Sequence, residues 1–202
     1  MKKYFIHLFV IIISSIFLGV ACVLLIKAHF GCDAMTTYYE GMQKTFHCPL
    51  SIANLTLNGT MAVIVCLFNY RQLGIGTIVC LIVGAYTMDI ASLYIGTFTG
   101  IYRILAFCLG LILMSLSIAL ASQTDIGKNP YDALCFSISH KINKKYNIIR
   151  FSIDCILLVI GLLLGGTLNI GTVISILCVG NLAEVFMKLI KFNKEINYEE
   201  SN

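Results

Sequence analysis

The sequence has 202 residues, of which 58% are hydrophobic and 12% are charged, and its formal net charge is +4. Soluble domains carry roughly 25% charged residues. The composition therefore excludes an ordinary soluble domain and confines any chemistry to the interior of a membrane or to its two surfaces.

Six apolar blocks are each long enough to cross a bilayer, which takes about 20 helical residues. In chain order, the predicted elements are a span at 4–27, an amphipathic segment at 32–47, spans at 49–69, 75–97 and 101–122, a second amphipathic segment at 128–145, and spans at 147–168 and 170–190. A polar C-terminal tail follows at 192–202. The predicted fold class is therefore an all-α membrane protein with six transmembrane helices.

Basic residues are distributed unevenly between the two sides of this arrangement. With a cytoplasmic N-terminus, the inner side holds Lys2, Lys3, Arg71, Lys128, Lys141, Lys144, Lys145, Arg150, Lys188, Lys191 and Lys194, and the outer side holds Lys27, Lys44 and Arg103. This excess follows the positive-inside rule. It predicts a multi-pass protein of the plasma (inner) membrane with both termini in the cytoplasm. Because Lys144 and Lys145 flank a span, we do not assign them to a nucleic-acid surface.

A pattern repeats in the chain at an offset of 96 residues. Gly31 and the candidate helix cap Asp33 recur as Gly127 and the candidate cap Asn129. An apolar stripe at helical spacing follows each cap, formed by Met35, Tyr38, Tyr39, Met42 and Phe46 in the first copy and by Tyr131, Leu134, Cys135, Ile138 and Ile142 in the second. The chain is therefore interpreted as two related halves.

The two repeats, 1–98 and 99–191, contain three spans each. Because three is odd, the second repeat is expected to enter the membrane from the opposite side. The segments 32–47 and 128–145 are too short and too polar to span, so each either lies at the interface or re-enters the membrane. Antiparallel repeats of this kind recur in secondary transporters, with the binding site near the midplane.

Two short motifs carry a resemblance to a known family. The segment Gly-Cys-Asp-Ala at 31–34 and the segment Leu-Gly-Ile-Gly-Thr at 73–77 resemble the YczE/YyaS/YitT-type bacterial integral membrane proteins, over nearly the whole chain. That family's pattern places a proline after the acidic residue. The first half has Ala34 there, and the second half keeps Pro130. The resemblance implies an integral plasma-membrane protein, and it supplies no substrate or reaction.

Polar side chains inside the predicted spans are the candidate binding residues, because a charged residue at the bilayer centre costs about 2.5–3.5 kcal/mol on insertion scales. The candidates are Asn54, Asn58, Asp89, Arg150, Asp154, Asn181 and Glu184. Asn54 and Asn58 match Arg150 and Asp154 at the repeat offset. We predict that these faces line a path or a central cavity, with Asp89 and Glu184 as ion or proton sites.

The same residues also have structural explanations. Asparagines in membrane helices form hydrogen bonds that hold helices together. Arg150 and Asp154 are four residues apart and able to form an ion pair. Arg150 is also close enough to the inner end of its span to extend its charge to the interface.

The sequence favours transport over catalysis. No G-x-S-x-G, H-E-x-x-H, P-loop or G-x-G-x-x-G motif occurs in a suitable context, so we expect no enzyme, no cofactor and no metal site. The leading interpretation is a small secondary transporter or permease for an unidentified small polar solute, with proton or cation coupling left open. The alternatives are a substrate-binding membrane subunit of a multi-component transporter and a non-transporting accessory or regulatory membrane protein. The expected partners are the lipid bilayer, a small molecule or ion, and a second copy of the chain; no nucleic acid is expected.

Overall fold

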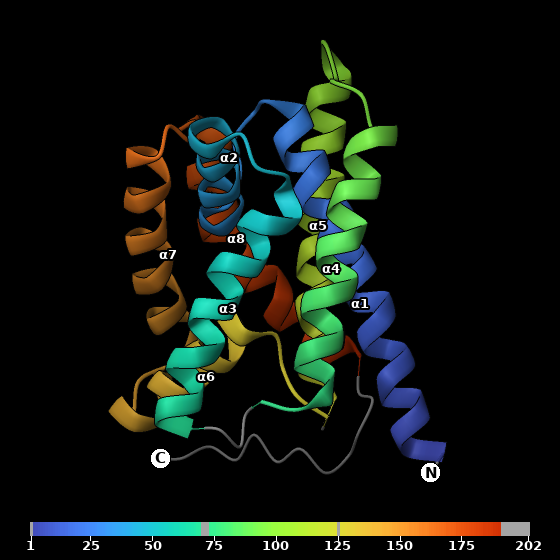
Figure 1. The fold of residues 1–202 in the computed structure, drawn as a ribbon, viewed down its shortest axis with the longest axis vertical. Coiled ribbons are helices and arrows are strands. Elements are labelled where there is room, and N and C mark those ends of the chain that lie inside the picture. The colour runs from blue at the N-terminus through green and yellow to red at the C-terminus, as the bar shows by residue number, and fades with distance from the viewer. Residues whose placement is uncertain (1, 70–72, 125, 191–202) are drawn as a thin grey trace.

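The computed structural model describes residues 2–69, 73–124 and 126–190, and this part of the chain is helical and contains no strand. Its eight helices are α1 (Lys2–Ala28), α2 (Ala34–Phe46), α3 (Leu50–Asn69), α4 (Ile75–Tyr94), α5 (Ile101–Ser122), α6 (Pro130–Ile142), α7 (Tyr146–Leu163) and α8 (Ile170–Leu189) (Figure 1). The six predicted spans and both amphipathic segments are therefore confirmed as helices. The predicted tail at 192–202 lies outside the described residues.

Six of these helices, α1, α3, α4, α5, α7 and α8, are long and apolar enough to cross a membrane. They carry large apolar side chains on the outside of the bundle. Leu67, Leu93 and Leu163, for example, are 80%, 83% and 83% exposed. So much exposed apolar surface is unusual for a soluble monomer, and it matches a bundle surrounded by lipid hydrocarbon. The chain therefore has the architecture of a polytopic membrane protein.

Two spans end earlier than the hydropathy of the sequence suggests. α4 stops at Tyr94, and α7 stops at Leu163, five residues before the predicted end. Beyond α7 the chain turns at Gly165, where φ is +86°, a conformation that glycine adopts without strain. The next residue, Gly166, lies so close to α2 that an added Cβ would stand 2.5 Å from the carbonyl oxygen of Thr37. Packing against α2 therefore sets this helix end.

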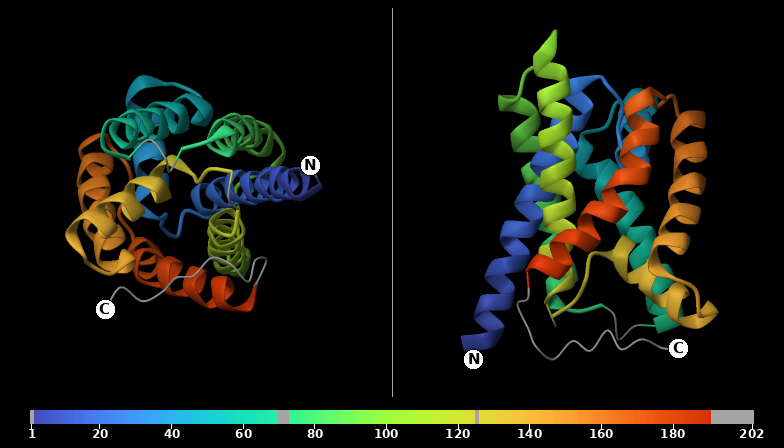
Figure 2. Two further views of the ribbon diagram at one scale, coloured as in Figure 1. Left: turned by 90° about the horizontal axis from the view of Figure 1, so that it is seen from below. Right: turned by 180° about the vertical axis from the view of Figure 1, so that it is seen from behind.

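Helix packing follows a matched scheme in the first half (α1–α4) and the second half (α5–α8). The first helices of the two halves, α1 and α5, pack on each other. The contact of α1 with α4 in the first half corresponds to the contact of α5 with α8 in the second. The contact of α2 with α7 likewise corresponds to the contact of α6 with α3. α2 lies toward one end of the molecule and α6 toward the other (Figure 1). α1 begins at the same end of the molecule at which α8 ends (Figure 2). Each short helix is thus supported by the second span of the other half.

The short helices α2 and α6 begin inside the bundle. Residues 34–37 and residues 130–135 are buried without interruption, and four successive helical residues cover every face of the helix. At the other ends, Phe46 and Ile142 are exposed. Each helix therefore starts among the spans and runs outward.

The loop before α2 docks on the third span of the second half. The backbone N–H of Gly171 donates to the carbonyl oxygen of Phe30 at 3.1 Å, and Ser175 Oγ donates to the carbonyl oxygen of Cys32 at 3.1 Å. Gly31 has φ of +134°, and a Cβ there would lie 2.4 Å from the backbone nitrogen of Thr172. Only glycine fits this approach.

The loop before α6 docks in the same way on the third span of the first half. The backbone N–H of Gly76 donates to the carbonyl oxygen of Ile126 at 2.8 Å, and Thr77 Oγ1 donates to the carbonyl oxygen of Lys128 at 2.7 Å. Gly127 has φ of +119°. Each of the two repeated glycines therefore lies on a helix start from the other half, Gly31 on α8 and Gly127 on α4.

Candidate functional site

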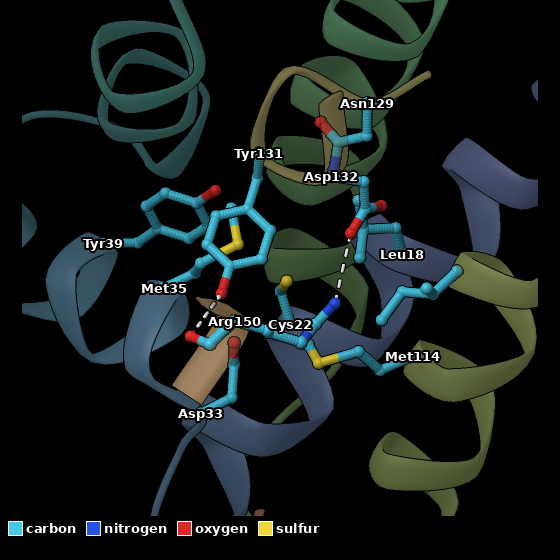
Figure 3. A pocket seen from close by; sticks show the side chains of 11 residues that line it. Leu18, Cys22, Asp33, Met35, Tyr39, Met114, Asn129, Tyr131, Asp132 and Arg150 are labelled. Atoms are coloured by element: carbon cyan, nitrogen blue, oxygen red, sulfur yellow. Dashed lines mark hydrogen bonds and ion pairs between the residues drawn. The ribbon is translucent and has the colours of Figure 1, made fainter. Parts of the chain in front are cut away.

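A cavity of about 20 Å³ lies where the two halves meet, between α1, α2, α5, α6 and α7. A cavity of this size has room for about one water molecule. Its polar lining residues are Asp33, Tyr39, Asn129, Tyr131, Asp132 and Arg150 (Figure 3). Asp33 and Asn129 directly precede α2 and α6, so both helix starts, with their partial positive charges, are directed toward this central cavity.

Arg150 on α7 is the cation of the central cavity. One guanidinium nitrogen lies 3.1 Å from a carboxylate oxygen of Asp132 and donates to the hydroxyl of Tyr146 at 2.8 Å. Its Nε lies 3.9 Å from the carboxylate of Asp154, one turn along the same helix. The side chain is only 7% exposed, and a buried charge of this kind requires ionic and hydrogen-bond partners. Arg150 is therefore already neutralised by carboxylates from α6 and α7.

Two buried tyrosines from the short helices hold the polar groups of α3 and α7. The hydroxyl of Tyr131 donates to the carboxylate of Asp154. The side-chain amide of Asn58 donates to the hydroxyl of Tyr39 at 2.9 Å and to the amide oxygen of Asn54 at 2.7 Å. One tyrosine thus binds a carboxylate and the other binds a neutral amide, at positions 58 and 154 that match at the repeat offset.

This difference between the tyrosines predicts unequal effects of removing each hydroxyl. Tyr131→Phe should lower the free energy of unfolding by about 1–3 kcal/mol, because a buried carboxylate loses a donor. Tyr39→Phe should lower it by only about 0.5–1.5 kcal/mol, because the lost hydrogen bond is between neutral groups. Thermal unfolding of the two variants in one detergent measures the difference. Equal losses would mean that Asp154 does not depend on Tyr131.

The structure brings four of the seven predicted residues toward the centre. Arg150 lines the central cavity and Asp154 pairs with it. Asn54 and Asn58 are buried on α3, and Asn58 contacts Tyr39, whose side chain lines the same cavity. The predicted pairing of Arg150 with Asp154 is therefore present, and the asparagines lie beside the cavity wall.

The other three predicted residues lie elsewhere. Asp89 accepts a hydrogen bond from the backbone N–H of Ser51 at 3.1 Å, in the first turn of α3. Glu184 accepts one from the side chain of Asn147, in the first turn of α7. A carboxylate at a helix start is stabilised by the free N–H groups and the helix dipole. Asn181 is exposed, and its amide donates to the carbonyl oxygen of Leu177 within α8.

Asp33 and Asp132 are site residues that the sequence analysis did not select. Both lie in or next to the amphipathic helices, where Asp33 was interpreted only as a candidate helix cap. In the structure Asp33 is 6% exposed, and its Oδ1 has no hydrogen-bond partner among the described residues. Burial raises the pKa of Asp33. The matched motifs at 31–34 and 127–130 were the signal that could have located it.

A second, larger cavity of about 260 Å³ lies toward the C-terminal end of α2. It continues the helix faces that line the central cavity. Along α1, Cys22 lines the central cavity and Ile26, one turn further, lines the larger one; along α2, Tyr39 and Gln43 do the same. Since residues four apart share one face of a helix, the two cavities follow one another along α1 and α2.

Glu40 forms part of the wall of this larger cavity. Its carboxylate lies 2.8 Å from Lys44 Nζ and accepts hydrogen bonds from the backbone and the hydroxyl of Thr167 at 3.0 and 2.7 Å. Burial alone would raise the pKa of Glu40, but the hydrogen bonds and the ion pair hold that pKa below its ordinary value.

We therefore expect Glu40 to make the protein less stable in acid. A carboxyl whose pKa is lowered by folding contributes stability that is present above its unfolded pKa and is lost as the pH falls through its folded pKa. Melting temperatures of the wild type and of Glu40→Gln, measured from about pH 7 to about pH 4, should converge toward the acid end. Parallel curves would contradict this role.

These features define a class, the polytopic α-helical membrane proteins with a buried polar centre. Within it, the chain belongs to a family of unknown function, DUF6198, whose model matches residues 4–188. The chain is also similar to an uncharacterized protein of Haemophilus influenzae (strain ATCC 51907 / DSM 11121 / KW20 / Rd), with 29% identity over 130 residues. The alignment covers 64% of this chain and 60% of that relative, so the chain spans less than two thirds of its length. No solved structure matches the chain.

Proposed function

We propose that the protein is a small secondary transporter or permease for a small polar solute, with a path that runs between its two halves. The observation that carries the proposal is the central cavity, where a buried guanidinium and buried carboxylates from both halves line the same space. Ionisable groups within membrane proteins are costly and usually mark substrate or ion pathways. The larger cavity, next along the same faces of α1 and α2, is the proposed entrance.

We further propose that the two halves are inverted repeats in the plasma membrane. The matched helix contacts and the positions of α2 and α6 at opposite ends support this arrangement, as does the odd number of spans in each half. The excess of basic residues on one side favours cytoplasmic termini. The resemblance to YczE/YyaS/YitT-type proteins favours the same membrane. In transporters built from inverted repeats, the site lies between the repeats near the midplane.

Side-specific labelling tests the inversion. Gln43 on α2 and His140 on α6 are exposed near the outer ends of the two short helices. In a chain whose native cysteines are replaced, Gln43→Cys and His140→Cys should react with a membrane-impermeant maleimide from opposite sides of the membrane. Reaction of both from one side would overturn the inverted arrangement and the permease proposal with it.

Transport itself is tested in liposomes that contain only the purified protein. A pool of small polar metabolites under a proton gradient should give flux above protein-free liposomes. Labelling Gln43→Cys, in the proposed entrance, should reduce that flux. Labelling Thr99→Cys, an exposed residue of the α4–α5 connection that does not line the larger cavity, should leave it unchanged. Equal effects at both positions would show that the larger cavity is not the entrance.

The same experiment separates the alternatives. A substrate-binding subunit would bind a solute and give flux only after an energising ATPase module is added. An accessory protein would give neither binding nor flux. We propose no catalytic activity, and we propose the lipid bilayer, the solute and a second copy of the chain as the partners.

A further inference from the structure

Asp33 occupies a costly position that its neighbours do not fully explain. The side chain is 6% exposed, lines the central cavity and has one carboxylate oxygen, Oδ1, without a hydrogen-bond partner among the described residues (Figure 3). Buried polar groups in folded proteins are nearly always partnered, and an unpartnered buried carboxylate is more costly than a neutral group. A group that is missing from the protein itself is therefore expected to bind Oδ1.

The charges around the cavity determine the sign of that group. Asp132 and Asp154 form ion pairs with Arg150, whereas no ion pair is found for Asp33 among the described residues. The nearby Lys128 directs its ammonium onto the ring of Phe136, 3.7 Å from the centroid. Each of the two helix starts contributes about half a positive charge. Arg150 and Lys128 both act electrostatically on Asp132, so Asp33 is the one of the three carboxylates without a contacting cation among the described residues.

The volume of the cavity limits the size of the missing group. About 20 Å³ accommodates a single water-sized particle, so an organic solute of several atoms does not fit beside Asp33. A divalent metal ion is disfavoured, since no group of three or more His, Cys, Asp or Glu side chains in the described residues is arranged to hold one. An anion would meet three carboxylates. A small monovalent cation satisfies charge, size and the preference of hard cations for oxygen ligands.

We propose that the carboxylate of Asp33 binds one small monovalent cation in the central cavity, of the size class of Na⁺, K⁺ or NH₄⁺. The side-chain amide of Asn129 and the carboxylate of Asp132 provide further oxygen atoms in the same wall. The binding site follows from the geometry, whereas the role of the ion as the coupling ion of transport rests on the proposed function. Residues 33 and 129 are equivalent in the repeat, and only the first half carries the acid.

The binding of a cation is tested by thermal unfolding of the purified full chain. Because the chain has no tryptophan but has nine cysteines, with Cys22, Cys32 and Cys135 among the buried ones, a thiol-reactive dye reports unfolding. In N-methyl-D-glucamine chloride, a cation too large for the cavity, addition of NaCl, KCl or NH₄Cl should give a saturable rise in melting temperature of about 3 °C or more for at least one salt.

Two variants and one direct measurement complete the test. Asp33→Asn should lose the cation-dependent rise, and Gly59→Ala, at a position with no atom within 4 Å of an added Cβ, should keep it. A rise that survives in Asp33→Asn would overturn the proposal. A second result would also overturn the proposal. In it, the melting temperature of the wild type responds to none of the three salts but changes between about pH 6 and about pH 8, and Asp33→Asn removes that change, because Asp33 would then hold a proton.

Equilibrium binding of ²²Na⁺ or ⁸⁶Rb⁺ (a K⁺ and NH₄⁺ analogue) to the wild type should approach one ion per chain, and absence of binding for both tracers would overturn the proposal even if Asp33→Asn does not fold. Cation binding without solute flux in liposomes would reject the transport function and leave the site intact. Solute flux without cation binding would reject the cation site and leave the transport function intact.

Discussion

Replacement of Arg150 by methionine is expected to lower the free energy of unfolding by about 3–5 kcal/mol, because removing one partner of a buried ion pair leaves its carboxylates uncompensated. Asp132 and Asp154 would lose their shared cation, and the hydroxyl of Tyr146 would lose a donor. For a chain of this length, the expected fall in melting temperature is on the order of 10 °C. The measurement is thermal unfolding with the thiol-reactive dye in one detergent.

A compensating variant serves as the control for this prediction. Changing Asp132 and Asp154 to asparagine in the Arg150→Met background removes the uncompensated charges, so it should recover part of the lost stability. The melting temperature of Arg150→Lys should lie between those of Arg150→Met and the wild type, since lysine supplies the charge without the planar, multiply donating guanidinium. A melting temperature of Arg150→Met equal to that of the wild type would mean that the cluster is not ionised.

The second large effect is expected at the loop that docks on α8. Gly31→Ala should largely prevent correct folding, because a Cβ would lie 2.4 Å from the backbone nitrogen of Thr172 and the residue has φ of +134°, each of which costs on the order of 1–3 kcal/mol or more. The yield of monodisperse protein and its melting temperature should both fall sharply. Gly171→Ala should act alike, since its Cβ would lie 2.5 Å from the carbonyl oxygen of Phe30.

A third glycine provides the matched comparison. Gly59 lies within α3 and has no atom within 4 Å of the position that a Cβ would take. Gly59→Ala should therefore leave the protein unchanged or stabilise it by up to about 1 kcal/mol, because alanine is the better helix former. Similar behaviour of Gly31→Ala and Gly59→Ala would show that the docked loop is not required for the fold.

The spans were predictable because length and apolarity are local signals. A helix of about 20 apolar residues is recognisable without knowledge of its neighbours. The end of α7 was not predictable in this way, since it depends on Gly166 packing against Thr37, more than a hundred residues away. The short helices were predicted as helices from their apolar stripes. Their burial was left open, because the stripes fit both an interfacial and a re-entrant helix, and the cation that pairs with Asp132 lies on another helix.

The candidate site was predictable only where its residues are close in sequence. The pairing of Arg150 with Asp154 follows from a spacing of four residues on one helix. Asp89 and Glu184 were singled out as charged residues in apolar spans, but spacing alone does not reveal the neighbouring helix start to which each is bonded. Whether they also bind an ion stays a prediction. Asp33 was hidden by its position beside a helix, where a carboxylate normally caps backbone N–H groups.

The exchange of loops between the halves has a consequence for biosynthesis. The ribosome makes Phe30 about 140 residues before Gly171, which at about 5–20 residues per second corresponds to a delay of roughly 7–30 s. The later loop, by contrast, finds Gly76 already synthesised when Ile126 emerges. The part of the protein that is translated first is therefore completed last, and a nascent chain interrupted before residue 170 leaves the loop before α2 without its docking site on α8.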